Sequence, residues 1–221
     1  MWAADLPGLG ESDLPELPWS LGAVAEIVAT GVRQLLGPDE SCDLVGFSFG
    51  ALVSAATAAR LADRVGTLVL VGASGLGVPR GDVTLEKVRS KTGEARVAAH
   101  RANLERLMIA DPSLVDAQAL AIQEWNTVHA RIKSVGLSPS TALLDALADT
   151  RCALAAIWGG EDAVARLNLA ERVAALSRLR PDAEVRIIPA AGHWVAYEAA
   201  DAFNTALAAI LGGERTRRSH G

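Results

Sequence analysis

Ser48 is the residue of this 221-residue chain whose setting most favours nucleophilic chemistry. It lies in the sequence GFSFG at residues 46–50, between the apolar run Cys42–Val45 and an alanine-rich segment at 51–61. A strand, a tight turn and a helix in this order form a nucleophile elbow, in which small flanking residues let the two backbones approach closely. The turn exposes the serine hydroxyl and points the helix N-terminus at developing negative charge. The pattern predicts Ser48 as a nucleophile, with an inert serine in a structural turn as the alternative.

A serine hydroxyl is a weak nucleophile without a base, and both a base and an acid follow it in this chain. Residues 153–158 indicate a buried strand, and the turn after it carries Asp162 beside a second carboxylate. Residues 184–189 indicate another strand, which is followed by His193 in the loop before a last helix. Because parallel strands of an α/β sheet carry their chemistry at one edge, we expect these side chains to lie near Ser48. The order Ser, acid, His matches one arrangement of the Ser-His-Asp triad.

Four motifs together resemble those of the α/β-hydrolase fold family. They are, in chain order, DLPGLGES at 5–12, GFSFG at 46–50, WGGED at 158–162 and AGHW at 191–194. The resemblance implies a mostly parallel sheet with helices on both faces, and a catalytic triad of Ser48, Asp162 and His193. It selects Asp162 over its neighbour Glu161, because Asp162 holds the position of the family's acid. It also implies that the backbone N–H of Phe49 is one donor of the oxyanion hole.

The evidence for a role in the site is weaker for the other aromatic and histidine side chains. Phe47 and Trp194 flank the nucleophile and the base, where they could line an apolar substrate pocket or pack in the core. His100 and His129 fall in predicted helices of an insert. We expect surface or packing roles for these two histidines, with contact to substrate as the less common alternative.

The predicted elements divide the chain into a core, an insert and a tail. The core comprises residues 1–73 and 151–213, the helical cap comprises 74–150, and the polar tail comprises 214–221. In the core, helical patterns cover 21–36, 51–61 and 201–211, and a β-rich run covers 67–71. The insert indicates helices throughout, at 96–110, from a cap at Asp111 or Ser113 to about 135, and at 141–148, with a break at 136–139. In the family, an insert at this place is a cap that buries the substrate.

The resemblance also implies a segment that is missing before the first motif. Residues 2–4 look like the tail of the strand before the turn at Asp5, whereas three strands, a helix and a His-Gly loop precede that point in the family. Ordinary strand and loop lengths give about fifty to seventy missing residues. We then expect the elbow strand, 43–47, to become an edge strand. We also expect one oxyanion donor to be absent, which typically costs about a hundred- to a thousandfold in rate.

Composition argues against several classes of partner. Half of the residues are hydrophobic and the net charge is −5, which favours a globular domain and disfavours binding to nucleic acid or an anionic membrane. No apolar run reaches membrane-spanning length, and no leader pattern opens the chain. Cys42 and Cys152 indicate reduced thiols in a cytoplasmic protein, and no Cys/His cluster has metal-ligand spacing. We expect a small-molecule substrate, no cofactor and no metal; whether the protein is a monomer or a homo-oligomer stays open.

A glycine-rich loop, GASGLG at 72–77, offers a competing interpretation because it resembles a dinucleotide-binding turn. That turn needs a helix starting at its last glycine. Pro79 and Gly81 follow here instead, so a loop leading into the cap explains the glycines better.

Fold alone does not select the reaction. A serine nucleophile argues against the dehalogenase and epoxide-hydrolase branches of the family, whose nucleophile is Asp. Two passages, 192–204 and 107–115, resemble the meta-cleavage C–C hydrolases, although the elbow matches that group less well at Phe47 and Ala51. We therefore expect a serine hydrolase acting on a small carboxylic ester or a related C–C ketone. The alternative is a non-catalytic or inactive truncated α/β-hydrolase-like protein.

Overall fold

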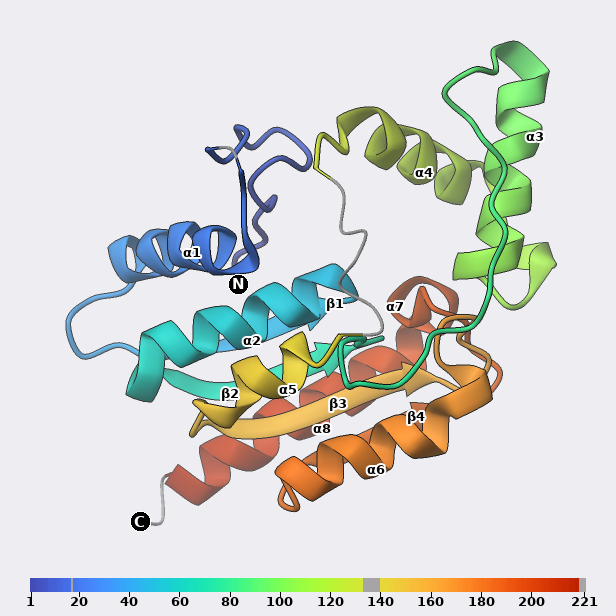
Figure 1. Cartoon of the computed structure of the whole chain (residues 1–221). Coiled ribbons are helices and arrows are strands. Elements are labelled where there is room, and N and C mark those ends of the chain that lie inside the picture. The colour runs from blue at the N-terminus through green and yellow to red at the C-terminus, as the bar shows by residue number, and fades with distance from the viewer. Residues whose placement is uncertain (17, 133–139, 219–221) are drawn as a thin grey trace.

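The computed structural model describes residues 1–16, 18–132 and 140–218, which contain one parallel sheet. Its four strands lie in the order β1 (Cys42–Phe47), β2 (Val65–Val71), β3 (Ala153–Gly159) and β4 (Glu184–Ile188). The register pairs Phe47 with Val71 and Val71 with Ile157, so the carboxyl ends of the strands meet at one edge of the sheet (Figure 1). The predicted strands and the parallel α/β class are confirmed.

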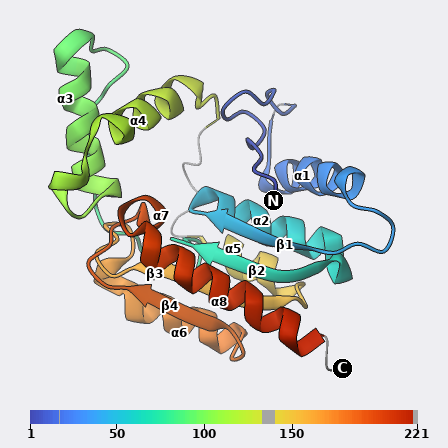
Figure 2. The ribbon, with the colours of Figure 1, turned by 180° about the vertical axis from the view of Figure 1, so that it is seen from behind.

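Helices cover both faces of this sheet, because the inner strands carry apolar side chains on both sides. Along β2, Leu68 and Leu70 pack on one face while Val69 and Val71 pack on the other, as the alternation of a strand requires. The first face is covered by α1 (Leu21–Leu35), α2 (Phe49–Leu61), α5 (Ala142–Ala148) and α6 (Leu169–Leu179). The second face is covered by α8 (Ala200–Arg218), which crosses the sheet in Figure 2.

The first two helices follow their sequence signals. The side chain of Ser20 accepts a hydrogen bond from the Ala23 N–H at 3.1 Å and so caps α1. The helix ends at Leu35, two residues before Gly37 and Pro38, a pair that does not continue a helix. The alanines of α2 are buried between α1 and the sheet. Their small side chains let α2 lie close to β1, and this closeness shapes the turn that joins them.

The inserted segment rises from the carboxyl edge of the sheet as two helices. They are α3 (Gly93–Asn103), followed by a π-helical turn at Leu104–Met108, and α4 (Ala117–His129). Four residues form a small apolar cluster between them: Leu104, Ile109, Val115 and Ala119. α4 lies between α3 and the N-terminal loop (Figure 1). The Arg131 N–H donates to the Gly8 carbonyl at 2.9 Å, which ties the end of the insert to that loop.

The insert differs from its sequence prediction in three places. Residues 74–92 form no regular helix, so the expectation of a wholly helical insert is wrong there. Gly75 and Gly77 have φ values of +87° and +72°, which a right-handed helix does not accommodate. The helix predicted at 96–110 ends at Asn103 and closes with the π-helical turn. α4 is capped by Asp116, which accepts from the Ala119 N–H at 2.8 Å, and Asp111 caps only a short 3₁₀ turn. The helix predicted to run to about residue 135 stops at His129, where Ala130 turns extended, so that prediction is wrong. The break predicted at 136–139 lies outside the described residues.

Two predicted boundaries also need comment. α5 lies within the range predicted as the cap, yet its Leu143 and Leu147 are fully buried in the main core. The division at residue 150 stays a prediction, and this packing favours a boundary before Ala142. The closing helix was predicted to end at 211, but α8 continues to Arg218. Glycines at 212 and 213 lower helix propensity without stopping the helix, and the last residues of the predicted tail, 219–221, lie outside the described residues.

The described N-terminal segment forms no strand, and β1 lies at an edge of the sheet. Residues 1–16 form turns without a helix or a strand, so the strand tail expected at 2–4 is not seen. Among the described residues β1 pairs only with β2, and Val45 and Phe47 are 45% and 38% exposed. The elbow strand is therefore an edge strand, as expected. In the described part of the chain no helix is long and apolar enough to cross a bilayer.

Candidate active site

Ser48 forms the sharp turn between β1 and α2. Its backbone has φ 53° and ψ −115°, a conformation that non-glycine residues rarely adopt. Strain of this kind typically costs about 1–3 kcal/mol and persists only where the surroundings enforce it. The Ser48 N–H donates to the Val71 carbonyl at 2.8 Å, which holds the turn against β2. The predicted elbow is therefore present, with Ser48 at its apex.

The two glycines of the elbow contribute unequally. A Cβ on Gly46 would lie 2.5 Å from the Ser54 Oγ and 2.7 Å from the Ala51 Cα, so only glycine lets α2 come this close to β1. A Cβ on Gly50 would meet no atom within 4 Å among the described residues. The expectation that both glycines permit close approach is correct for Gly46 and wrong for Gly50. The Cβ of Gly50 would point away from β1 into open space.

The three residues of the predicted triad meet in one chain of hydrogen bonds. The Nε2 of His193 lies 3.0 Å from the Ser48 Oγ, and its Nδ1 lies 2.8 Å from the Asp162 Oδ2. His193 and Asp162 are both buried, at 3% and 0% exposure. A carboxylate facing Nδ1 fixes the proton on that nitrogen and leaves the Nε2 lone pair for the serine.

A glycine under the imidazole was missed by the sequence reasoning. Gly72 follows β2 with φ +57°, and a Cβ there would lie 3.1 Å from His193 Cε1 and 3.3 Å from the Phe47 ring. The Phe47 ring centroid lies 4.9 Å from that of His193. Gly72 is the first glycine of the loop that resembled a dinucleotide turn. A glycine directly after the strand next to the elbow strand was the available signal, because that position faces the base.

The acid loop is held from behind by a buried cation, Arg172 of α6. Its Nη2 donates to the carbonyls of Pro79 and Val164 at 2.8 and 3.1 Å. The Val164 N–H donates in turn to Asp162 Oδ1 at 2.8 Å. Burial lowers the pKa of the Arg172 guanidinium below its ordinary value, and the neighbouring Asp162 carboxylate opposes this shift. Arg172 therefore joins the loop after β2 to the loop that carries Asp162.

The remaining candidates lie elsewhere. Glu161, the rival acid, is exposed and pairs with Arg166 at 3.4 Å. His100 is buried in α3 with its Nε2 2.6 Å from Glu124 Oε2 on α4. His129 stacks on Trp125 with ring centroids 3.7 Å apart. The structure thus gives His100 and His129 contacts within the insert.

Phe47 and Trp194 line the same apolar cavity, which no triad residue lines and which reaches the His193 ring through the Phe47 ring. Its volume is about 290 Å³, and it is bounded also by Val71 of β2, Ile122 of α4 and Phe203 of α8. Trp194 also packs against the apolar cluster of the insert, so the two roles left open by the sequence both have support in its contacts. The cavity is small and apolar, which suits the hydrophobic part of a small ligand.

Phe49 is the first residue of α2, and its backbone N–H has no carbonyl four residues back within the helix. The Phe49 ring meets that of Trp19 edge to face with centroids 6.1 Å apart. The N–H next to the nucleophile is thus not consumed by the helix. Among the described residues no group of three or more His, Cys, Asp or Glu side chains is arranged to hold a metal ion.

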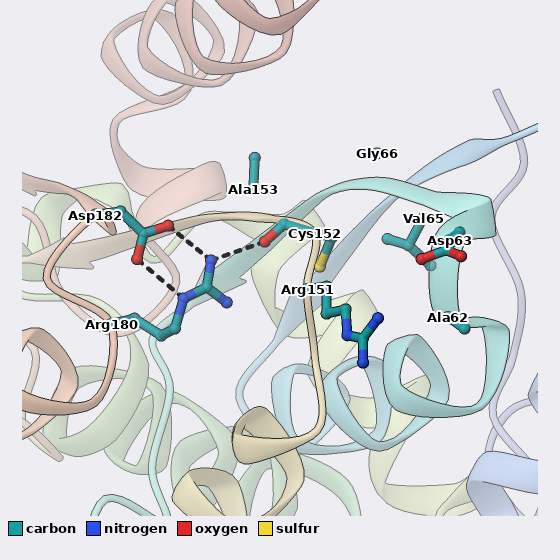
Figure 3. A pocket seen from close by; sticks show the side chains of 9 residues that line it. All are labelled: Ala62, Asp63, Val65, Gly66, Arg151, Cys152, Ala153, Arg180 and Asp182. Carbon is teal, nitrogen blue, oxygen red and sulfur yellow. Dashed lines mark hydrogen bonds and ion pairs between the residues drawn. The ribbon is translucent and has the colours of Figure 1, made fainter.

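A larger cavity, of about 410 Å³, opens at the opposite edge of the sheet (Figure 3). It lies between the starts of β2 and β3, and Arg180 spans it by donating to Asp182 at 2.8 Å and to the Cys152 carbonyl at 2.8 Å. No triad residue lines it. Burial raises the pKa of the Cys152 thiol above its ordinary value, which makes this thiol a poor nucleophile. Size alone therefore does not mark the reactive site of this chain.

The turn at residues 5–12 closes on itself. The Asp5 carboxylate accepts the Glu11 N–H at 3.0 Å, and the Ser12 hydroxyl donates to the Asp5 carbonyl at 2.7 Å. Gly10 has φ +54°, and a Cβ there would overlap the Asp5 carboxylate. The Asp, Gly and Ser of this motif are therefore structural residues that fix the loop.

The arrangement can activate Ser48 for attack on an electrophilic carbon. His193 would take the Oγ proton on Nε2, and Asp162 would stabilise the imidazolium that forms. The strained elbow holds Oγ clear of the sheet, and the Phe47 ring that contacts the base bounds the apolar cavity. This is the geometry of acyl transfer by a serine.

Comparison with known proteins agrees with this geometry. Residues 1–206 match a family model described as the alpha/beta hydrolase family. A dihydrolipoyllysine-residue acetyltransferase component of the acetoin cleaving system of Pseudomonas putida is 31% identical over 95% of this chain and 55% of its own length. The chain thus spans about half the length of that relative.

Two further matches are hydrolases. A 2-hydroxy-6-oxo-6-phenylhexa-2,4-dienoate hydrolase of Burkholderia cepacia is 27% identical over 90% of this chain and 72% of that protein. The solved structure of a meta-cleavage product hydrolase from Pseudomonas fluorescens IP01 superposes with a TM-score of 0.72 and 25% identity, covering 95% of this chain and 78% of that one.

Proposed function

Since this chain belongs to the alpha/beta hydrolase family, we propose that it is a serine hydrolase with Ser48 as nucleophile, His193 as general base and Asp162 as the supporting acid. The observation that carries the proposal is the unbroken chain of hydrogen bonds from Ser48 Oγ through His193 to Asp162, at 3.0 and 2.8 Å. The burial of both partners and the strained turn at Ser48 support it. Buried polar groups and strain together are typical of functional sites.

In the proposed reaction Ser48 Oγ forms a bond to the substrate carbonyl carbon while its proton moves to His193 Nε2. The Phe49 N–H donates to the oxyanion that develops, aided by the N-terminus of α2. The imidazolium then protonates the leaving group, and water cleaves the acyl-enzyme by the same steps. The chain's own residues supply this chemistry, so the proposal needs no cofactor.

The substrate class we propose is a small carboxylic ester or a related C–C ketone. The cavity of about 290 Å³ lined by Phe47 and Trp194 supports a small, partly apolar acyl group, because the Phe47 ring that bounds it lies 4.9 Å from the His193 ring. The similarity to a dienoate hydrolase and to a meta-cleavage product hydrolase supports the C–C ketone. We further propose that residues 74–141 act as a cap, because α4 contributes Ile122 to this cavity. The free thiols Cys42 and Cys152 support a reducing compartment such as the cytoplasm.

Labelling with a fluorophosphonate tests the nucleophile. We expect the wild type to form a covalent adduct on Ser48, while Ser48→Ala forms none and His193→Ala labels at least about a hundredfold more slowly. Mass spectrometry of the labelled peptide identifies the site. A folded wild type that does not label would overturn the proposal in favour of a non-catalytic α/β-hydrolase-like protein.

The two substrate classes are separated by turnover. A short p-nitrophenyl ester and a dienoate ring-fission product, offered at equal concentration, would be compared by kcat/KM. Preference for the dienoate by tenfold or more assigns C–C cleavage, and the reverse assigns ester cleavage. Ser48→Ala serves as the blank for both.

A further inference from the structure

One carboxylate joins the insert to the loop that carries His193. Glu198, the last residue of a short helix, α7 (Val195–Glu198), accepts three backbone N–H groups. Its Oε2 accepts from Gly192 at 2.6 Å and from Ala110 at 3.0 Å, and its Oε1 accepts from Asp111 at 2.7 Å. A single oxygen is therefore shared between the residue before His193 and the base of the insert. Hydrogen bonds to a charged acceptor are about twice as strong as neutral ones.

Two more hydrogen bonds connect the same two segments. The Trp194 N–H donates to the Met108 carbonyl at 2.7 Å, directly after His193. The Tyr197 hydroxyl donates to the Asp116 carboxylate at 2.7 Å, and that carboxylate also caps α4. Trp194 and Tyr197, which follow His193, are thus bonded directly to the stretch that links α3 and α4. Gly192, which precedes His193, is joined to that stretch through Glu198.

Gly192 shows how close this contact is. A Cβ at that position would lie 2.8 Å from the Ala110 N, 2.8 Å from the Met108 O and 2.9 Å from the Glu198 Oε2. Real Cβ atoms do not approach other atoms this closely, so only glycine fits between the insert and the carboxylate. The histidine loop and the base of the insert form one packed unit.

We propose that Glu198 is a positioning residue that couples the docked insert to the base of the triad, an inference that rests on the proposed function. While residues 108–111 are docked, Glu198 keeps all three donors and holds the peptide before His193 in place. When the insert moves away, Glu198 loses the Ala110 and Asp111 N–H donors, and the loop around His193 is no longer bonded to the insert. The imidazole is then aligned with Ser48 only while the insert is closed over the site.

The kinetics differ according to whether Glu198 only stabilises the fold or also aligns His193. Loss of a brace that only stabilises the fold lowers the melting temperature and leaves the active fraction unchanged at low temperature. Loss of a brace that aligns His193 slows the proton-transfer step itself, because small misplacements of a catalytic group cost rate rather than affinity.

The test uses Glu198→Gln in the full chain with p-nitrophenyl acetate and a small fluorophosphonate, neither of which is large enough to need the insert for binding. A glutamine keeps the side-chain length but turns an NH₂ group toward backbone N–H donors. We expect kcat and the maximal labelling rate to fall by about ten- to a hundredfold, with KM and the half-saturating probe concentration within about threefold. Glu184→Gln, which removes an exposed carboxylate paired with Arg186, is the matched control and should retain wild-type rates.

A second variant, at Gly192, disrupts the same contact between the histidine loop and the insert. Gly192→Ala should reproduce the fall in kcat, because its Cβ pushes the insert and Glu198 away from the loop. The double variant should be no slower than the slower single variant, since both changes break one interaction. A double variant whose loss in kcat equals the product of the two single losses would overturn the coupling. An unaffected kcat in Glu198→Gln would overturn it as well.

Hydrogen exchange of the wild type supplies a measurement that needs neither variants nor catalysis. Opening of the insert releases the amides of Ala110 and Asp111 from Glu198 and leaves Gly192 on a loop that has lost its link to the insert. The three amides should therefore show protection within about tenfold of one another. Much faster exchange at Gly192 alone would overturn the coupling. A wild type that does not label overturns the proposed function together with this role, whereas a labelled wild type with an unaffected Glu198→Gln overturns this role alone.

Discussion

The Oγ of Ser48 and the Nε2 of His193 lie 3.0 Å apart, although 145 residues separate them in the chain. The elbow fixes Ser48, and the loop after β4 fixes His193. Their distance therefore depends on strand register and on the atoms packed around the imidazole. Substitutions that disturb these supports should change the reactivity of Ser48 without altering any of the three hydrogen-bonded side chains.

The first prediction concerns the glycines of the elbow. Gly46→Ala should destabilise the fold by about 1–3 kcal/mol, because its Cβ would overpack against α2. Gly50→Ala should keep or raise stability by up to about 1 kcal/mol, since its Cβ meets open space and alanine favours a helix. Thermal melting followed by circular dichroism measures both. Equal losses in the two variants would contradict the asymmetry.

The second prediction concerns the backbone under the base. Gly72→Ala places a Cβ 3.1 Å from the His193 ring and should slow fluorophosphonate labelling by at least about tenfold. Gly93→Ala is the matched control: its φ of +53° resembles the +57° of Gly72, but its Cβ would meet no atom within 4 Å among the described residues. Both variants carry a similar backbone cost, so both should melt earlier. Labelling at the wild-type rate in Gly72→Ala would show that the imidazole tolerates the displacement.

The third prediction concerns the cation behind the acid loop. Arg172→Met should destabilise the fold by about 1–3 kcal/mol, because two buried hydrogen bonds from the guanidinium are lost. The Pro79 and Val164 carbonyls keep second donors, the Asn168 Nδ2 at 3.2 Å and the Gly81 N–H at 3.0 Å. The loop that orients Asp162 should loosen at the same time, which slows labelling. Arg178→Met removes an exposed arginine of the same helix and should leave both quantities near wild type. A melting temperature of Arg172→Met equal to that of Arg178→Met would contradict the role of the buried guanidinium.

The fourth prediction concerns pH and the cavity at the opposite edge. The hydrogen bond from Arg180 holds the pKa of Asp182 below its ordinary value. A carboxyl whose folded pKa is depressed contributes stability above its unfolded pKa, near 3.9, and loses it as pH falls through the folded pKa. Asp182→Asn should therefore melt earlier than wild type at pH 7, and the difference should shrink below about pH 4.

The control for this pH dependence is Asp63→Asn, which removes one carboxylate from the other side of the same cavity. At pH 7 the melting temperature of Asp63→Asn should differ less from that of wild type than the melting temperature of Asp182→Asn does. A difference for Asp182→Asn that is constant from pH 7 to pH 3 would contradict the role of the ion pair. Labelling of Ser48 should be unchanged in both variants, because the cavity lies away from the triad.

The strands of the sheet and the side chains that meet at its carboxyl edge could be predicted from the sequence. Apolar runs ending in glycine-rich turns are local signals, and parallel strands that end at one edge bring those turns together whatever the details of packing. Ser48 and His193 could therefore be named without the structure, whereas the choice of Asp162 over Glu161 rested on the resemblance to the family's motifs. The stop of α1 was also readable, because the Gly37-Pro38 pair acts over a few residues.

The surroundings of those side chains could not be predicted from the sequence. That Gly72 lies under the imidazole, that Glu198 binds the insert as well as the histidine loop, and that α5 joins the core are contacts between segments far apart in the chain. No local pattern encodes such contacts, since they depend on how loops pack once the sheet has formed. Gly46 and Gly50 look equivalent in the motif, and only packing separates them, because α2 crowds one and leaves the other free.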